Sequence, residues 1–295
     1  ETKHLKMSKL LVTLSLVLGI VLSSSNNKGK TGGSSSVGTH KRVVSKPKGC
    51  CGLFCRKGVV NAVRDDDSPP PTYVVPDIIV KRKEVRTFNE FEQQRFVLDI
   101  KKMMQNKFGP QTSPYYEIAK WYGEQQYNCY YGGESFPNWN RLFLREFEKQ
   151  LQLADVQNGF DGNIGLPYWN WMNPDYVNPN TSKIEVIPEF IREAFKELPK
   201  DLLMENVPKI QRRSDKDISK LIHNFNVKSD AEQCLFAQEH YMFAAKGFEQ
   251  SSNYPSIQKS NNAMHSIMGY PMSDVKYAPY DIMFWLHYSN VDRIY

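Results

Sequence analysis

The C-terminal end of the chain carries the stretch that decides its fold. Residues 278–295 read APYDIMFWLHYSNVDRIY, an aromatic-rich run that also contains His287, Asn290, Asp292 and Arg293. We expect a helix from Asp281 to Tyr295. Shortly before this run the chain reads Asn261-Asn262-Ala263-Met264-His265 and then Gly269-Tyr270-Pro271-Met272. Together the two segments form one continuous block of motifs.

A second block of motifs lies in the middle of the chain. It reads Cys129-Tyr130-Tyr131-Gly132, then FPNWNRLFLREFE over residues 136–148, then LPYWNW over residues 166–171. Apolar residues recur with a period near 3.6 from Trp139 to Leu153, so we predict a core-facing helix there, opened by Phe136 and Pro137. A turn-rich stretch follows at residues 158–163.

The remaining periodicity also favours helices. We predict them over residues 89–104, 115–121, 188–197 and 230–246. Stretches of alternating polar and apolar residues, which would indicate strands, are scarce. The domain is therefore predicted to be mainly α.

The N-terminal part of the chain has a different composition. Lysines precede an apolar run from Leu10 to Leu22, and small residues follow it, which predicts a secretory signal peptide over residues 1–25. Residues 26–80 are basic, Ser/Gly-rich and then Pro-rich, typical of a disordered linker. This leaves residues 81–295 as one domain.

The formal charge of +6 does not indicate a nucleic-acid partner. Residues 1–64 hold twelve Lys or Arg and one acid, so the basic excess belongs to the predicted signal and linker, and the domain itself is net acidic. We expect no nucleic-acid partner and no membrane contact beyond the signal segment. The oligomeric state stays open.

Both blocks of motifs resemble the copper-binding signatures of the tyrosinase, catechol oxidase and molluscan haemocyanin family. The first is similar to Cys-x-His-Gly, Phe-Pro-x-Trp-His-Arg and Pro-Tyr-Trp-Asp-Trp, and the second to His-Asn-x-x-His and Phe-Trp-Leu-His-His-x-Asn-Val-Asp-Arg. The resemblance covers roughly residues 85–295. It implies a tyrosinase-like antiparallel four-helix bundle with long loops, in which two helix pairs each present three histidines to one copper of a type 3 pair.

The ligand positions themselves depart from the family pattern. Five of the six histidines that the resemblance implies are replaced, and the nine-residue separation of Tyr131 and Asn140 equals the family's, so the alignment is not slipped. The replaced positions are Tyr122, Tyr131 and Asn140 for the first copper and Asn261 and Tyr288 for the second. His265 alone is retained. The residues around these positions match the family: Cys129, Trp139, Arg141, Phe284, His287, Asn290, Asp292 and Arg293.

These replacements predict that copper binding is reduced or absent. A dicopper centre that binds dioxygen needs several neutral nitrogen donors on each ion. Amide oxygens are poor donors for Cu(I), and a phenol of pKa about 10 seldom offers phenolate at neutral pH. We therefore predict a secreted, catalytically inactive member of the family, either retained as a binding or structural module or drifting without function.

Two other interpretations stay open. One is an active copper oxidoreductase that converts phenols or catechols to o-quinones, with other donors, such as His223 or His240, completing the site. The other is a single altered metal site, for example iron held by Tyr122, Tyr131, Tyr288 and His265, since phenolates favour hard ions. In either case a phenolic small molecule is the expected partner. Separately, Asn180-Thr181-Ser182 is an N-glycosylation acceptor pattern if the chain is secreted.

Overall fold

The structure, a computed structural model, describes residues 79–106, 109–123, 133–203, 205, 207, 209–244 and 256–295. The chain divides into two units, residues 1–48 and 49–295, and every described residue belongs to the second. The predicted signal peptide and nearly all of the predicted linker lie outside the described residues. Their assignments, and the domain boundary near residue 81, stay predictions.

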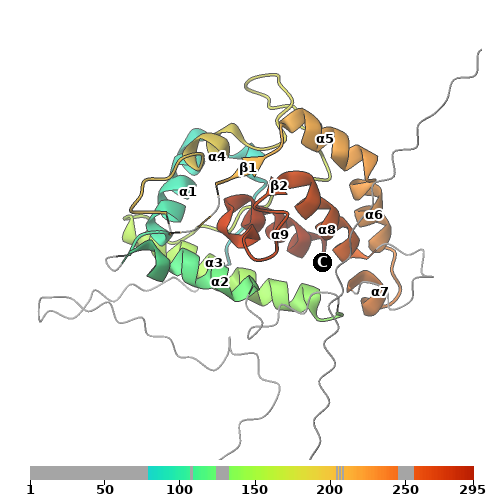
Figure 1. Cartoon of the computed structure of the whole chain (residues 1–295), viewed down its shortest axis with the longest axis horizontal. Coiled ribbons are helices and arrows are strands. Elements are labelled where there is room, and N and C mark those ends of the chain that lie inside the picture. Colours follow the sequence, from blue (N-terminus) through green and yellow to red (C-terminus); the bar gives the residue numbers. More distant parts are fainter. Residues whose placement is uncertain are drawn as a thin grey trace, which may run out of the picture. The chain divides into compact units, whose positions relative to one another are not determined.

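The described part is mainly helical (Figure 1). Its helices are α1 (Glu90–Met103), α2 (Pro114–Gly123), α3 (Phe136–Gln157), α4 (Glu189–Ala194), α5 (Asp215–Asn224), α6 (Val227–Cys234), α7 (His240–Ala244), α8 (Ile257–Met268) and α9 (Ile282–Ile294). Short 3₁₀ turns span Val85–Thr87, Pro110–Thr112 and Ala278–Tyr280. Two two-residue strands, β1 (Gln211–Arg212) and β2 (Gly269–Tyr270), pair antiparallel with Gln211 opposite Tyr270.

The predicted helices over 89–104, 115–121, 139–153 and 281–295 are confirmed as α1, α2, α3 and α9. Pro137 lies in the first turn of α3, where its missing N–H has no intrahelical partner to lose. Local hydrogen bonds also explain where two helices begin. Asn89 and Glu92 form a reciprocal capping box at the start of α1. At the start of α9, the Asp281 side chain accepts from the Met283 N–H at 2.9 Å.

Two predictions of helix extent were wrong. The helix predicted over 188–197 ends at Ala194, because Phe195 at its C-cap already departs from helical geometry (φ −119°, ψ 11°). The helix predicted over 230–246 is broken into α6 and α7. The last turn of α6 tightens into i→i+3 hydrogen bonds, and Leu235 and Phe236 are exposed, so their apolar spacing does not mark a buried face. Helices α5 and α8 were not among the predicted ranges.

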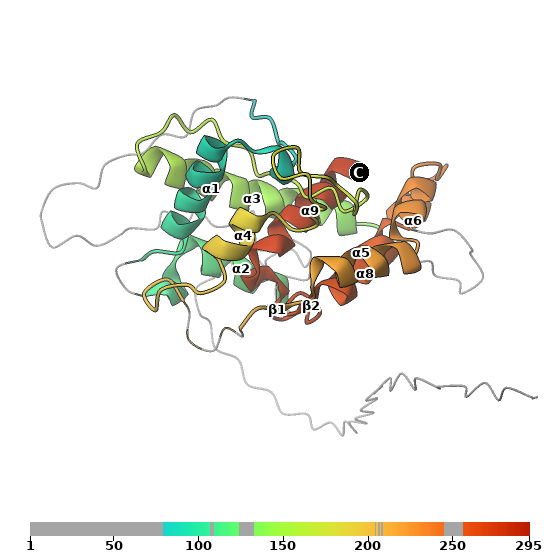
Figure 2. The same ribbon diagram turned by 90° about the horizontal axis from the view of Figure 1, so that it is seen from above.

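Helices α2, α3, α8 and α9 pack through aromatic rings into the predicted four-helix arrangement. Phe147 of α3 stacks on Trp285 of α9 with ring centroids 3.8 Å apart, and Tyr122 of α2 meets Phe284 of α9 edge-on at 4.8 Å. His265 of α8 meets Tyr288 of α9 at 5.7 Å. Two perpendicular views place α9 between α3 and α8 (Figures 1 and 2). The centre of the bundle is therefore built around α9.

A buried carboxyl pair joins α1 to α3. Asp155 of α3 is held by the Arg95 guanidinium through bonds of 2.6 and 2.7 Å, while its neighbour Asp99 of α1 receives one hydrogen bond, from Asn158 at 2.8 Å. Burial raises the pKa of Asp99 to about 8, with a further contribution from Asp155. Asp99 is thus mostly protonated at neutral pH and can donate to the Asp155 carboxylate.

This pair makes stability depend on pH. Between about pH 4 and pH 8 the folded state binds more protons at Asp99 than the unfolded chain, whose aspartate pKa is about 3.8, so the free energy of unfolding falls as the pH rises. Asp99→Asn, which resembles the protonated acid, is expected to remove this decline and to stabilise the protein at pH 8 by about 2 kcal/mol. Urea denaturation at pH 5 and pH 8 measures it, with the exposed Glu90→Gln as control. A pH dependence unchanged in Asp99→Asn would contradict this assignment.

Candidate metal centre

The structure brings four of the predicted ligand positions to the centre of the bundle. Tyr122 comes from α2, Asn140 from α3, His265 from α8 and Tyr288 from α9. Asn261, one helical turn before His265 on α8, brings a fifth. All are buried except His265, which keeps part of its surface exposed. Tyr131 and Cys129 lie outside the described residues, so their predicted places are not tested.

Two tyrosines and the retained histidine form a continuous hydrogen-bonded chain. His265 Nδ1 lies 2.7 Å from the carbonyl oxygen of Met272, an acceptor, so this nitrogen carries the proton. Its Nε2 is then an acceptor and receives the Tyr288 hydroxyl at 3.4 Å. Because the Tyr288 proton is committed to His265, Tyr122 donates its own to the Tyr288 oxygen. The order of donation is Tyr122 to Tyr288 to His265 to Met272.

The electrostatics keep both histidines of the centre neutral. Burial lowers the pKa of His265 to about 4, and the Met272 carbonyl opposes this only in part. Burial, with His265 as a like-charged neighbour, also holds the pKa of His287 well below its usual range. A neutral imidazole with Nδ1 held by a carbonyl is the state in which histidines bind metal through Nε2. His265 thus keeps the tautomer of a ligand, with Tyr288 at its Nε2.

The two asparagines are turned toward protein groups. Asn261 Oδ1 accepts from His287 Nε2 at 2.9 Å, and Asn140 Nδ2 donates to the Phe136 carbonyl, one turn earlier on α3, at 2.8 Å. Asn140 Oδ1 and His287 Nδ1 are buried without a hydrogen-bond partner among the described residues. Sequence reasoning missed the Asn261–His287 bond, since no local pattern pairs residues 26 positions apart.

The predicted supporting residues surround this centre. Arg141 donates to Asp292 Oδ1 at 2.6 Å, and Arg82 reaches the other Asp292 oxygen at 2.7 Å. Arg293 donates to Asn290 at 2.9 Å. Phe284 lies against Tyr122, His265 and Tyr288, and Trp139 stacks on Phe143 with centroids 4.8 Å apart. Arg82 was not predicted, because it precedes the motif blocks.

The candidate substitutes His223 and His240 lie on the surface, away from this centre. His223 on α5 is exposed and lies 2.8 Å from Asp175, and His240 on α7 contacts the Glu134 carbonyl at 3.1 Å. In the part of the chain that the structure describes, no three His, Cys, Asp or Glu side chains gather in a way that could hold a metal ion. The structure does not bring a second imidazole donor from these positions to His265.

The donors that the described residues bring to this centre do not fit a copper pair. The only ligand-position imidazole among them, His265, has a phenol at its Nε2, and the two phenols bond to each other. The Asn261 oxygen is engaged by His287, and the Asn140 amide donates back to its own helix. Amide and neutral phenol oxygens are weak donors for Cu(I), which needs imidazole or sulfur. The Asn261 and tyrosine oxygens are thus engaged by other protein groups, whereas Asn140 Oδ1 is buried without a hydrogen-bond partner among the described residues.

Removing the Tyr288 hydroxyl should destabilise the protein. Tyr288→Phe deletes both the bond to Tyr122 and the bond to His265, so we expect the free energy of unfolding to fall by about 1–2 kcal/mol. Urea denaturation measures this loss, with the exposed Tyr241→Phe as control. A loss no larger than that of Tyr241→Phe would contradict the role of the Tyr288 hydroxyl in the hydrogen-bonded chain.

The fold and the site define a helical domain that presents its ligand positions from two helix pairs. Residues 100–295 match the family model described as the common central domain of tyrosinase. The chain therefore belongs to the tyrosinase family of type 3 copper proteins, which confirms the resemblance. Among the described helices, none is long and apolar enough to cross a membrane.

Curated relatives are molluscan haemocyanins. The chain is 28% identical over 182 residues to a G-type haemocyanin of Enteroctopus dofleini. This match covers 57% of this chain and 6% of the relative. It is 29% identical over 182 residues to a haemocyanin 2-c chain of Megathura crenulata, covering 57% of this chain and 38% of the relative. The chain thus spans well under half the length of these two relatives.

Solved tyrosinases share the fold. The match to a copper-bound active tyrosinase of Aspergillus oryzae covers 72% of this chain and 78% of that tyrosinase chain, with a TM-score of 0.54 and 15% identity. The match to a recombinant mushroom tyrosinase covers 73% of this chain and 49% of that tyrosinase chain, with a TM-score of 0.51 and 18% identity. At these identities the similarity concerns the fold alone.

Proposed function

We propose that this tyrosinase-family domain does not assemble a dicopper centre and does not oxidise phenols. The observation that carries the proposal is the centre of the bundle, where the hydroxyls of Tyr122 and Tyr288 bond to each other at two ligand positions. A pair of coppers would require imidazoles there. Support also comes from Asn261, whose amide oxygen accepts from His287 Nε2, and from Asn140, whose Nδ2 donates to the Phe136 carbonyl.

The buried aromatic centre and the ion pairs of Arg141 and Arg82 with Asp292 stabilise the bundle through contacts that involve no metal ligand position. We propose a secreted binding or structural module, with a phenolic small molecule as the candidate partner. Nucleic acid is a poor candidate, since the basic excess of the chain lies in residues 1–64.

A second candidate is a module with one altered metal site. The feature that favours it is the convergence of two phenols and one neutral imidazole in the hydrogen-bonded chain of Tyr122, Tyr288 and His265. Phenolates bind hard ions such as Fe(III), and the ion itself would have to displace the phenol protons. Such a site would hold one ion, and copper pairing would still be absent.

Metal analysis of the purified protein tests these proposals. After incubation with Cu(I) and separately with Fe(III), followed by gel filtration, we expect less than about 0.2 metal ions per chain, because no imidazole cage is present. We also expect no peroxo absorbance after copper and peroxide, and no quinone from catechol. Two coppers per chain with catechol oxidation would overturn the proposal, whereas one tightly held Fe(III) with a phenolate absorption band would favour the second candidate.

A further inference from the structure

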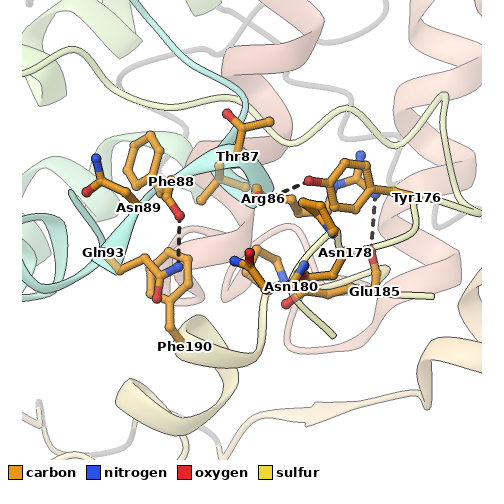
Figure 3. A pocket seen from close by; sticks show the side chains of 13 residues that line it. Arg86, Thr87, Phe88, Asn89, Gln93, Tyr176, Asn178, Asn180, Glu185 and Phe190 are labelled. Carbon is orange, nitrogen blue, oxygen red and sulfur yellow. Dashed lines mark hydrogen bonds between the residues drawn. The ribbon is translucent and has the colours of Figure 1, made fainter. Parts of the chain in front are cut away.

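A groove that shares no residue with the candidate metal centre lies between the turn at Val85–Thr87, the start of α1, the loop around residues 176–180 and the start of α4. Its volume is about 310 Å³. Aromatic rings of Phe88, Tyr176 and Phe190 line it together with the amides of Asn89, Gln93 and Asn178 (Figure 3). Asn180 lies at the same groove.

The charged residues of the groove are already bound to the protein. The Arg86 guanidinium donates to Glu84 and to the carbonyls of Asn170, Asn173 and Glu185, at 2.7–3.3 Å. The Glu185 carboxylate accepts from Asn178 Nδ2 at 2.7 Å and from the Glu189 N–H at 2.8 Å. Since both charges are engaged, the lining offers a ligand mainly neutral aromatic and amide groups. This chemistry suits a neutral, hydroxyl-rich ring better than an anion.

The loop that carries Asn180 is exposed and held in place. Val177 pairs antiparallel with Ile184, the Asn178 N–H donates to the Lys183 carbonyl at 2.9 Å, and the Asn180 N–H donates to Asn178 Oδ1 at 2.8 Å. Residues 179–184 are all exposed. Asn180-Thr181-Ser182 is also the only Asn-x-Ser/Thr pattern without proline in the 295-residue sequence. A single acceptor asparagine thus lies at the surface, on the rim of a groove.

We propose that Asn180 carries an N-linked glycan and that its first N-acetylglucosamine lies along this groove against Phe88 and Phe190. These two rings are nearly parallel, with an interplanar angle of 18° and centroids 6.5 Å apart, and together they provide an apolar wall for a pyranose. Asn89 Nδ2 and Gln93 Oε1, which make no hydrogen bond among the described residues, can bond its hydroxyl and acetamido groups. The proposal rests on the secretory location that forms part of the proposed function.

Attachment is tested on the full chain expressed in insect cells, once with its own N-terminal segment and once behind an added secretory leader. Intact mass before and after PNGase F should show one glycan in both cases. Asn180→Gln and Ser182→Ala should lose it, and Thr181→Ala, which changes the same loop but keeps the pattern, should retain it. Secreted protein with unmodified Asn180 would overturn the proposal. A glycan seen only with the added leader would uphold the acceptor site and contradict the secretory location instead.

The position of the first sugar in the groove is tested by the rate at which PNGase F releases the glycan from the native protein. Phe190→Ala removes one wall of the groove and should speed release by about threefold or more, since the sugar loses a ring contact. Phe91→Ala, an aromatic substitution on exposed α1 surface outside the groove, should leave the rate unchanged. Circular dichroism confirms that both variants are folded. Equal rates for wild type and Phe190→Ala would overturn the groove assignment. Copper content of Asn180→Gln, measured alongside, reports on the metal-site proposal independently.

Discussion

Replacing Asp281 by alanine is expected to lower the free energy of unfolding by about 3–5 kcal/mol. Asp281 is fully buried and pairs with Arg212, whose Nε donates to Oδ2 at 3.0 Å and whose second nitrogen bonds Oδ1. The same carboxylate caps α9 through the Met283 N–H. Asp281→Ala therefore leaves a buried guanidinium without its charge partner and removes the cap of the helix around which the bundle packs.

A double-mutant cycle separates these two effects. Urea denaturation of Asp281→Ala, Arg212→Met and the double variant should show the double variant to be more stable than the sum of the single losses predicts, because it leaves no unpaired buried charge. Arg141→Met, whose side chain is about half exposed, is the matched control for a surface ion pair and should cost about 1 kcal/mol or less. A loss below about 1 kcal/mol for Asp281→Ala would contradict the importance of this pair.

Introducing two histidines beside His265 should create a copper site that the wild-type protein is proposed to lack. The double substitution Asn261→His with Tyr288→His places two further imidazoles beside His265, the retained ligand position. Asn261 and His265 are one turn apart on α8, and Tyr288 bonds His265 from α9. Three neutral nitrogens suit copper, so we expect about one copper per chain. Metal analysis after gel filtration measures it.

The control for this experiment adds His265→Ala to the same double variant. It removes one imidazole and should reduce the affinity for copper at least about tenfold. The double variant should still not oxidise catechol, since Tyr122 and Asn140 remain at the other copper position and dioxygen chemistry needs both ions. If the double variant binds no copper although circular dichroism shows that it is folded, then ligand loss is not what prevents copper binding.

Helix prediction succeeded where local chemistry is sufficient. Helices α1, α2, α3 and α9 combine apolar periodicity with local start signals such as Asn89 and Pro137. Helix α5 begins with Ser214 accepting from Asp217 at 3.2 Å, a local signal that could have found it. The break between α6 and α7 has no such signal: it follows from Leu235 and Phe236 being exposed, which depends on how the helices pack.

The sequence by itself determined the family and the mainly helical fold, because contiguous motifs such as residues 278–295 carry both. It also predicts that five ligand histidines are replaced. Only the tertiary structure decided what the replaced side chains do. The Tyr122–Tyr288 bond joins residues 166 positions apart, and the Asp281–Arg212 pair joins residues 69 apart. Hydrogen bonds and ion pairs act over a few ångströms, so such partners are chosen by the packing of α2, α8 and α9 and by no local pattern.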